Sequence, residues 1–275
     1  MADLLSELHI VICIFTFLFG ICVGSFLNVC IFRIPANKSI IFPPSECPDC
    51  HTKLSPIDLI PVLGYILLKG KCRYCKKPIS VQYPLVEFLT GTVWLLIYLR
   101  YGLSIETAAL LFLYTLLIPV TFIDLKYMII PNGLVLTGII GGIALSVYHI
   151  FVSPFSLYQS SSWYAPFLGM VSASGILFAI AVIGFIIYKN DGAMGMGDVK
   201  LFIPIGMFLG WKLALLALFL AVILGGVTSI VLLILKIKER KSAIPFGPFI
   251  AVATYITGFY GNQIISWYFS LSNGF

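Results

Sequence analysis

The chain has 275 residues, of which 60% are hydrophobic and only 10% are charged. Ordinary soluble domains carry roughly 25% charged residues, so this composition excludes a soluble protein. Between Lys126 and Lys189 the sequence contains no Asp, Glu, Lys or Arg. That stretch alone is long enough for two membrane crossings and a turn.

We predict an all-α polytopic membrane protein with about eight transmembrane helices. A crossing helix needs about 20 apolar residues because its backbone polar groups must be satisfied within the segment. The sixth candidate is short, so we expect it to be tilted, re-entrant or continuous with Val199. The predicted spans are His9 to Phe32, Pro84 to Leu99, Thr107 to Ile123, Asn132 to Phe151, Trp163 to Tyr188, Leu201 to Trp211, Leu213 to Leu235 and Ile244 to Tyr268.

The distribution of basic residues predicts the orientation, because cytoplasmic loops retain Lys and Arg. With the N-terminus outside, only Arg100 and Lys212 of the 17 basic residues fall on the outer side. The net charge of +6 therefore reflects loop asymmetry and does not indicate a nucleic-acid partner. The N-terminus carries Asp3 and Glu7 and lacks a basic region, so we expect the first span not to be a removable signal peptide.

A charged, proline-containing insert from residue 33 to 83 follows the first span. It contains two CxxC pairs, Cys47 with Cys50 and Cys72 with Cys75. Two such pairs supply four thiolates for a tetrahedral Zn²⁺, and a site with four cysteines leaves no open position for catalysis. We therefore predict a structural zinc centre. The alternatives are disulfides, which are rare in a cytoplasmic segment, idle thiols, and His51 as a competing ligand.

Five acidic residues lie outside the N-terminus, the insert and the last basic loop: Glu87, Glu106, Asp124, Asp191 and Asp198. Glu106 suits the start of a helix, where negative charge is favourable. Asp124 ends an uncharged span, and Asp198 follows Gly195-Met-Gly197 at the start of another. The predicted topology puts both at the same membrane face. Acids at membrane depth are costly and usually functional.

Two neighbouring carboxyl groups can hydrolyse a peptide bond, since one activates water while the other stays protonated and polarises the carbonyl. Either aspartate could be the base. The alternative is that Asp124 pairs with Lys126 and Asp198 with Lys200, each pair anchoring a helix end. Asp191 competes as a candidate but lies in a polar turn. Gly20 and Gly24 on the first span predict close helix packing.

The chain resembles the type IV prepilin peptidases, also called prepilin leader peptidase/N-methyltransferases, over almost its whole length. Two positions depart from the family pattern: Ala193 stands in place of a glycine, and Asn132 follows Pro131 where Asp is common. The resemblance rests on an ordered set of motifs: Gly24-Ser-Phe-Leu-Asn28 with Arg33 and Pro35, the paired CxxC insert with Ile60-Pro-Val-Leu, Tyr83-Pro-Leu-Val-Glu87, Ile123-Asp124 with Pro131-Asn132, Met194-Gly-Met-Gly-Asp198-Val-Lys200-Leu201, and Ile244-Pro-Phe-Gly-Pro248.

The resemblance implies a GxGD-type aspartic protease of the bacterial cytoplasmic membrane, with Asp124 and Asp198 at the catalytic positions and Gly195, Gly197 and Lys200 in the active-site loop. It implies that prepilins and pseudopilins are cut after a short basic leader at the cytoplasmic face. It also implies that the new N-terminus is methylated with S-adenosylmethionine.

No GxGxxG motif follows a strand, so no Rossmann-type site for a methyl donor is predicted. The resemblance instead points to Asn28, Arg33 and Glu87 as a possible methyltransferase site. We therefore expect a first helix over residues 1–32, a zinc insert with a possible methyltransferase part over 33–83, and a peptidase core over 84–275. The alternatives are a peptidase without methyltransferase activity and a non-enzymatic transporter or scaffold.

Overall fold

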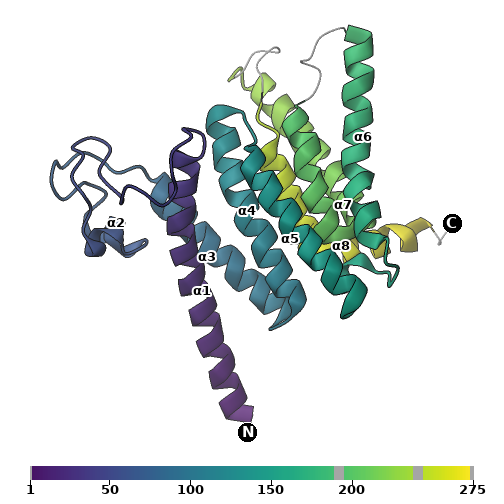
Figure 1. The fold of residues 1–275 in the computed structure, drawn as a ribbon, viewed down its shortest axis with the longest axis horizontal. Helices are drawn as coiled ribbons and strands as arrows, with labels where there is room; N and C mark the ends of the chain where they lie inside the picture. Colours follow the sequence, from purple (N-terminus) through teal and green to yellow (C-terminus); the bar gives the residue numbers. More distant parts are fainter. Residues whose placement is uncertain (1, 189–194, 238–243, 273–275) are drawn as a thin grey trace. The chain divides into compact units, whose positions relative to one another are not determined.

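The computed structural model describes residues 2–188, 195–237 and 244–272. These residues form helices, and no β-strand occurs among them. The predicted all-α class is therefore confirmed. Figure 1 labels the long helices α1 (Ala2–Arg33), α3 (Gln82–Tyr101), α4 (Ile105–Tyr127), α5 (Asn132–Phe151), α6 (Ala165–Tyr188), α7 (Met196–Ile234) and α8 (Gly247–Ser272). Three short turns complete the set, η1 (Pro56–Leu59), α2 (Leu63–Leu67) and η2 (Ser156–Tyr158).

Several of these helices meet the physical requirements of a membrane span. Five stretches are long and apolar enough to cross a bilayer: Glu7–Arg33 of α1, Ile105–Tyr127, Asn132–Phe151, Ala165–Ile187 and Met196–Ile234. Of the two other long helices, α3 contains the predicted second span, and α8 begins at Gly247, after the predicted start of the last span at Ile244. The described part of the chain is thus that of a polytopic membrane protein.

Helix α7 contains the sixth predicted span and all of the seventh except its last residue, Leu235. Its backbone leaves the helical region at Gly210, where φ is 76° and ψ is 170°. A side chain strongly disfavours this conformation, and glycine adopts it readily. Both ends of α7 lie at the same end of its unit in Figure 1, so the chain turns back at Gly210. The sixth span begins at Met196, before the predicted Leu201, so its continuation through Val199 is confirmed.

The helices form two compact units, Met1–Leu103 and Ser104–Phe275. In the first unit, α1 packs against α3 through glycines. A Cβ on Gly20 would lie 2.9 Å from Gly91 Cα, and one on Gly24 would lie 2.7 Å from Glu87 Cα. Both distances are too short for a side chain, so the predicted close packing of this glycine pair is confirmed.

In the second unit, α7 packs closely against α6, and α4 is joined to α8 by a hydrogen bond. A Cβ on Gly206 of α7 would overlap the backbone carbonyl of Gly169 on α6, and the converse holds for Gly169. The hydroxyl of Tyr114 on α4 donates a 2.9 Å hydrogen bond to the Thr254 carbonyl on α8. These contacts set the relative positions of the helices that carry the site described next.

Candidate active site and metal centre

Asp124 is a buried residue in the last turn of α4. Met128 ends the helix in a left-handed conformation (φ 54°, ψ 39°), and its N–H donates a 2.9 Å bond to the Asp124 carbonyl. Asp124 Oδ2 accepts a 2.8 Å hydrogen bond from the N–H of Gly247, the first residue of α8. Because a helix N-terminus stabilises negative charge, α8 both holds and orients this carboxyl group.

Gly247 has a steric requirement that the sequence did not reveal. A Cβ at this position would lie 2.8 Å from Asp124 Oδ2 and 3.2 Å from Asp124 Cβ. Any side chain would therefore push the two groups apart. The motif Ile244-Pro-Phe-Gly-Pro248 was the only sequence signal at this position. The packing of α8 against Asp124 at the end of α4 explains why this motif contains a glycine.

Asp198 lies in the first turn of α7, directly behind the glycines of the predicted GxGD motif. Its N–H donates a 3.0 Å hydrogen bond to the carbonyl of Gly195, the residue that precedes the helix. A Cβ on Gly195 would lie 2.8 Å from Asp198 Oδ2, and one on Gly197 would lie 3.0 Å from Ile130 Cβ. The two glycines therefore make room for the carboxyl group and for the α4–α5 connection.

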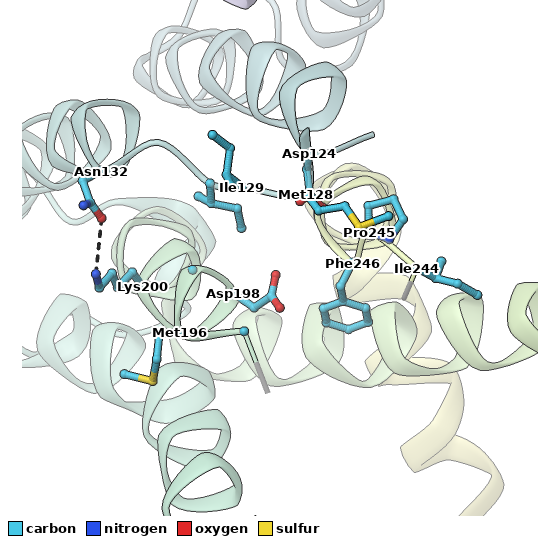
Figure 2. A pocket seen from close by; sticks show the side chains of 13 residues that line it. Asp124, Met128, Ile129, Asn132, Met196, Asp198, Lys200, Ile244, Pro245 and Phe246 are labelled. Atoms are coloured by element: carbon cyan, nitrogen blue, oxygen red, sulfur yellow. Dashed lines mark hydrogen bonds between the residues drawn. The ribbon is translucent and has the colours of Figure 1, made fainter. Parts of the chain in front are cut away.

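Asp124 and Asp198 line one cavity of about 470 Å³. Figure 2 shows both carboxyl groups at this cavity, with Phe246 beside them. The two aspartates can act together only if the C-terminal end of α4 lies near the N-terminal end of α7. The structure brings these two ends together. The other residues that line the cavity are Met128, Ile129, Ile130, Asn132, Gly195, Met196, Gly197, Lys200, Ile244, Pro245 and Phe246.

The lysines near the two aspartates have other contacts. Lys200 Nζ donates a 3.3 Å hydrogen bond to Asn132 Oδ1 at the edge of the cavity (Figure 2). Lys126 Nζ lies 5.2 Å from the centre of the Tyr127 ring. Among the residues that the structure describes, Asp198 forms no ion pair, so its alternative interpretation as a helix anchor paired with Lys200 is wrong. The competing candidate Asp191 and the departure at Ala193 lie outside the described residues.

The four insert cysteines meet at one point. Their Sγ atoms all lie within 4.8 Å of one another, and the Cys47 and Cys75 sulfurs are 3.8 Å apart. A tetrahedral zinc site with Zn–S bonds near 2.3 Å requires sulfur separations of about 3.8 Å. All four cysteines are free of disulfides. The donor set therefore fits Zn²⁺.

The two CxxC pairs have the same backbone geometry. Cys47 N–H donates to Thr52 and Cys72 N–H to Lys77, at 3.0 and 2.8 Å. The residue after each pair, His51 and Lys76, has a positive φ of 54° and 62°. His51 itself lies 3.7 Å from a Glu46 oxygen and is not part of the sulfur cluster, so it does not compete as a ligand in this arrangement.

A buried carboxylate ties η1 to the second cysteine pair. The Asp58 side chain is 1% exposed and contacts Arg73 Nε at 2.7 Å, and Ser55 Oγ donates to it at 2.8 Å. Burial raises the pKa of Asp58, but the hydrogen bonds from Ser55 and Arg73 outweigh this effect and leave it below its ordinary value. The ionised Asp58 therefore stabilises the folded insert. This stabilisation is complete above the ordinary pKa of Asp and is lost as the pH falls through the lower pKa that Asp58 has in the folded state.

The three polar residues predicted as a possible methyltransferase site have distinct environments. Asn28 Nδ2 donates to the carbonyls of Gly24 (3.4 Å) and Tyr83 (3.0 Å), while its Oδ1 is buried without a partner. Glu87 is also buried, and its Oε2 accepts a 2.7 Å hydrogen bond from the N–H of Val62 in the insert.

Arg33 is directed to a different part of the insert from Glu87. Its guanidinium donates to the carbonyls of Ser39 (3.0 Å) and Pro43 (2.7 Å). Asn28 and Glu87 lie close together on the packed α1–α3 pair. Asn28 contacts Tyr83, one helical turn before Glu87 on α3, and Glu87 contacts Gly24, one helical turn before Asn28 on α1. Arg33 instead orders the loop that follows α1.

Two family models match the chain. The bacterial peptidase A24 N-terminal domain matches residues 18–101, and the type IV leader peptidase family matches residues 111–230. The two matches fall in the two compact units. No solved structure matches the chain.

Curated relatives match over nearly the full length. A Bacillus subtilis protein named prepilin leader peptidase/N-methyltransferase is 36% identical over 94% of this chain and 98% of its own length. Proteins of the same name from Aeromonas hydrophila and Pseudomonas aeruginosa are 31% and 28% identical, and cover 92% and 97% of this chain and 92% and 96% of their own lengths. The chain therefore belongs to the type IV leader peptidase family and is a membrane peptidase.

Proposed function

We propose that this protein removes the short basic leader of type IV prepilins and pseudopilins with an aspartyl dyad, Asp124 and Asp198. The observation that supports this most directly is that two carboxyl groups from different helices line one cavity. The printed names of the relatives supply the substrate class. Membership of a peptidase family argues against the transporter or scaffold alternative.

The surroundings of the two aspartates suggest separate roles. The Gly247 N–H and the start of α8 stabilise negative charge on Asp124. Among the described residues, no hydrogen bond does the same for the Asp198 side chain. We assign Asp124 as the carboxylate that takes a proton from water as the water oxygen bonds to the scissile carbonyl carbon. Asp198 donates a hydrogen bond to the carbonyl oxygen. When the C–N bond then breaks, the proton that Asp124 took from water passes to the leaving amine.

The position of the cavity suits a substrate with a polar leader and an apolar helix. Asp124 ends one candidate membrane span and Asp198 begins another, which supports a cavity at one membrane face and not at mid-depth. Apolar side chains such as Ile129, Ile244 and Phe246 line it. The basic residues of the predicted cytoplasmic loops favour the inner side of a bacterial cytoplasmic membrane for this face. Gly195, Gly197 and Lys200 form the wall nearest Asp198.

We further propose that the first unit methylates the new N-terminus, as the relatives' names suggest. S-adenosylmethionine would supply an activated methyl group there. The buried Asn28 Oδ1 and the Glu87 carboxyl are acceptors that suit the N–H groups of an amine, and the cysteine centre, with Zn²⁺ bound, would hold the insert on them. In this division the insert 33–83 belongs to methylation and the second unit to cleavage. Arg33 would order the insert.

The test is incubation of detergent-purified protein with a synthetic prepilin N-terminal peptide, with and without S-adenosylmethionine, followed by mass spectrometry. We expect cleavage after the leader glycine, and a methyl mass only when the donor is present. Cleavage without the added methyl mass would support the alternative of a peptidase without methyltransferase activity.

Asp124→Asn and Asp198→Asn should each abolish cleavage while the protein still binds the peptide. Glu87→Gln should lower methylation of a pre-cleaved peptide and leave cleavage intact. Full cleavage by either aspartate variant would overturn the dyad.

A further inference from the structure

The short helix α2 in the insert exposes its apolar side. Leu63, Ile66 and Leu67 are 57%, 60% and 69% exposed, and their spacing puts them on one face of the helical turn. Gly64, in contrast, is buried, and a Cβ there would lie 2.7 Å from the Asp58 carbonyl oxygen. The helix therefore packs on the insert through its glycine and presents the three large side chains outward. We call these three residues the α2 face.

Positive charge borders the α2 face. Eight basic and three acidic residues lie between positions 33 and 83, and two of the acids are paired at 2.7 Å, Asp58 with Arg73 and Asp49 with Lys77. Lys69 and Lys71 follow α2 directly and are exposed. Neither forms an ion pair with any residue that the structure describes. An apolar surface with free lysines at its edge is typical of segments that bind anionic membrane surfaces.

A second ordered part of the insert presents apolar side chains in the same manner. Ile41 and Phe42 are each 72% exposed, and their N–H groups donate to Ser39 Oγ at 3.2 and 3.3 Å. Arg33, the last residue of the membrane span in α1, holds this loop through its bonds to the Ser39 and Pro43 carbonyls. The loop is thus fixed at the end of a membrane helix with two large apolar groups pointing outward.

We propose that the insert rests on the bilayer surface, with the α2 face among the lipid chains near the headgroups and Lys69 and Lys71 on anionic headgroups. Continuity favours lipid as the occupant. The exposed apolar surface of the same unit includes Phe26 of α1 and Leu85 of α3, which lie near the ends where the insert leaves and rejoins the membrane helices. The proposal does not depend on the enzymatic activities. It gives the insert a lipid contact that limits how far it can move from the membrane.

The experiment uses the full-length protein in nanodiscs made from a mixture of phosphatidylglycerol and phosphatidylcholine. Leu67→Trp adds a fluorescent side chain to the α2 face, and its emission is obtained by subtracting the wild-type spectrum. Quenching is measured with lipids brominated on their acyl chains and with acrylamide in the water. Zinc content confirms that the variant insert is folded, and Phe42→Trp provides a second position if Leu67→Trp loses metal.

We expect brominated lipid to remove most of the added fluorescence and acrylamide to have little effect. The opposite pattern would overturn the proposal, because the side chain would then face water. Protection from both quenchers would also overturn it, since a protein surface would then cover the α2 face. In Lys69→Gln/Lys71→Gln/Leu67→Trp, lipid quenching should fall in anionic discs toward the level in pure phosphatidylcholine. Unchanged quenching in that variant would exclude the anionic contact.

Discussion

At the scale of single residues, the candidate active site depends on positions where no side chain is tolerated. The Asp124 carboxyl occupies the space that a Cβ on Gly247 would need, and the Asp198 carboxyl does the same beside Gly195. The glycines therefore determine where the two carboxyl groups can stand. These glycines carry no reactive group, and they contribute to the site by leaving space for the carboxyl groups.

Gly247→Ala should reduce cleavage strongly. The added methyl would meet Asp124 Oδ2 at 2.8 Å, so the carboxyl group must move and its hydrogen bond from the 247 N–H must lengthen. A displacement of about 1 Å can cost about 10²-fold in rate. The measurement is kcat on a prepilin peptide.

The matched control is Gly226→Ala, because nothing lies within 4 Å of a Cβ at that position of α7. Its kcat should equal that of the wild type. Equal activity of both alanine variants would show that the Gly247 contact does not position Asp124.

At the scale of elements, the position of α7 is set by a backbone contact with α6. Gly206 and Gly169 approach so closely that neither can carry a side chain. Small residues at helix contacts allow dense packing in membranes, where there is no hydrophobic driving force between helices. The start of α7 carries Asp198, so this contact also supports the site.

Gly206→Ala should lower the melting temperature in detergent, because overpacking of this kind costs about 1–3 kcal/mol. Gly175→Ala on α6 is the control, since its Cβ would meet only Val171 Cγ1 at an ordinary 3.5 Å. If both variants had the melting temperature of the wild type, the α6–α7 contact would be less tight than described.

Cys72→Ser should release zinc and make the insert sensitive to protease. Structural zinc contributes about 10–16 kcal/mol of binding free energy in small domains, and three sulfurs cannot close a four-cysteine site. Methylation should fall more than cleavage, because the cleavage carboxyls belong to the other unit. Metal content, limited proteolysis and the two activities are the measurements.

Cys22→Ser is the control for this experiment, because Cys22 is an exposed residue of α1 outside the sulfur cluster. It should retain zinc and a protected insert. A Cys72→Ser protein with a full complement of zinc would contradict the proposed centre.

At the scale of the whole molecule, the two units divide the chain much as the two family models do. The paired carboxyls lie in the second unit, and the cysteine centre with Asn28 and Glu87 lies in the first. We therefore expect the two activities to be separable by mutation within one chain.

The proposed orientation can be tested with reporter insertions in cells. Alkaline phosphatase inserted after Leu103 should be active, because the α3–α4 connection is predicted to lie outside. The same enzyme inserted after Lys53 in the insert should be inactive. The reverse pattern would place the carboxyl cavity on the outer side and overturn the proposed cytoplasmic site.

The sequence by itself determined the membrane class, the approximate positions of the long helices and the cysteine set. Residues Asn132–Phe151 form a helix with the bounds predicted, because about 20 apolar residues must satisfy their own backbone in lipid. The four cysteines were identifiable because the spacing within a CxxC pair is local geometry. Both inferences need only residues that are near one another in the chain.

The tertiary structure alone decided which groups meet. It brought Asp124 and Asp198 to one cavity, placed Gly247 against a carboxyl group, and directed Arg33 and Glu87 to different parts of the insert. It also showed α7 turning back at Gly210. These outcomes depend on how helix surfaces fit together over long sequence separations. Hydropathy and spacing describe each helix singly: the spacing of Gly20 and Gly24 predicted a close contact on the first span, but not which helix makes it.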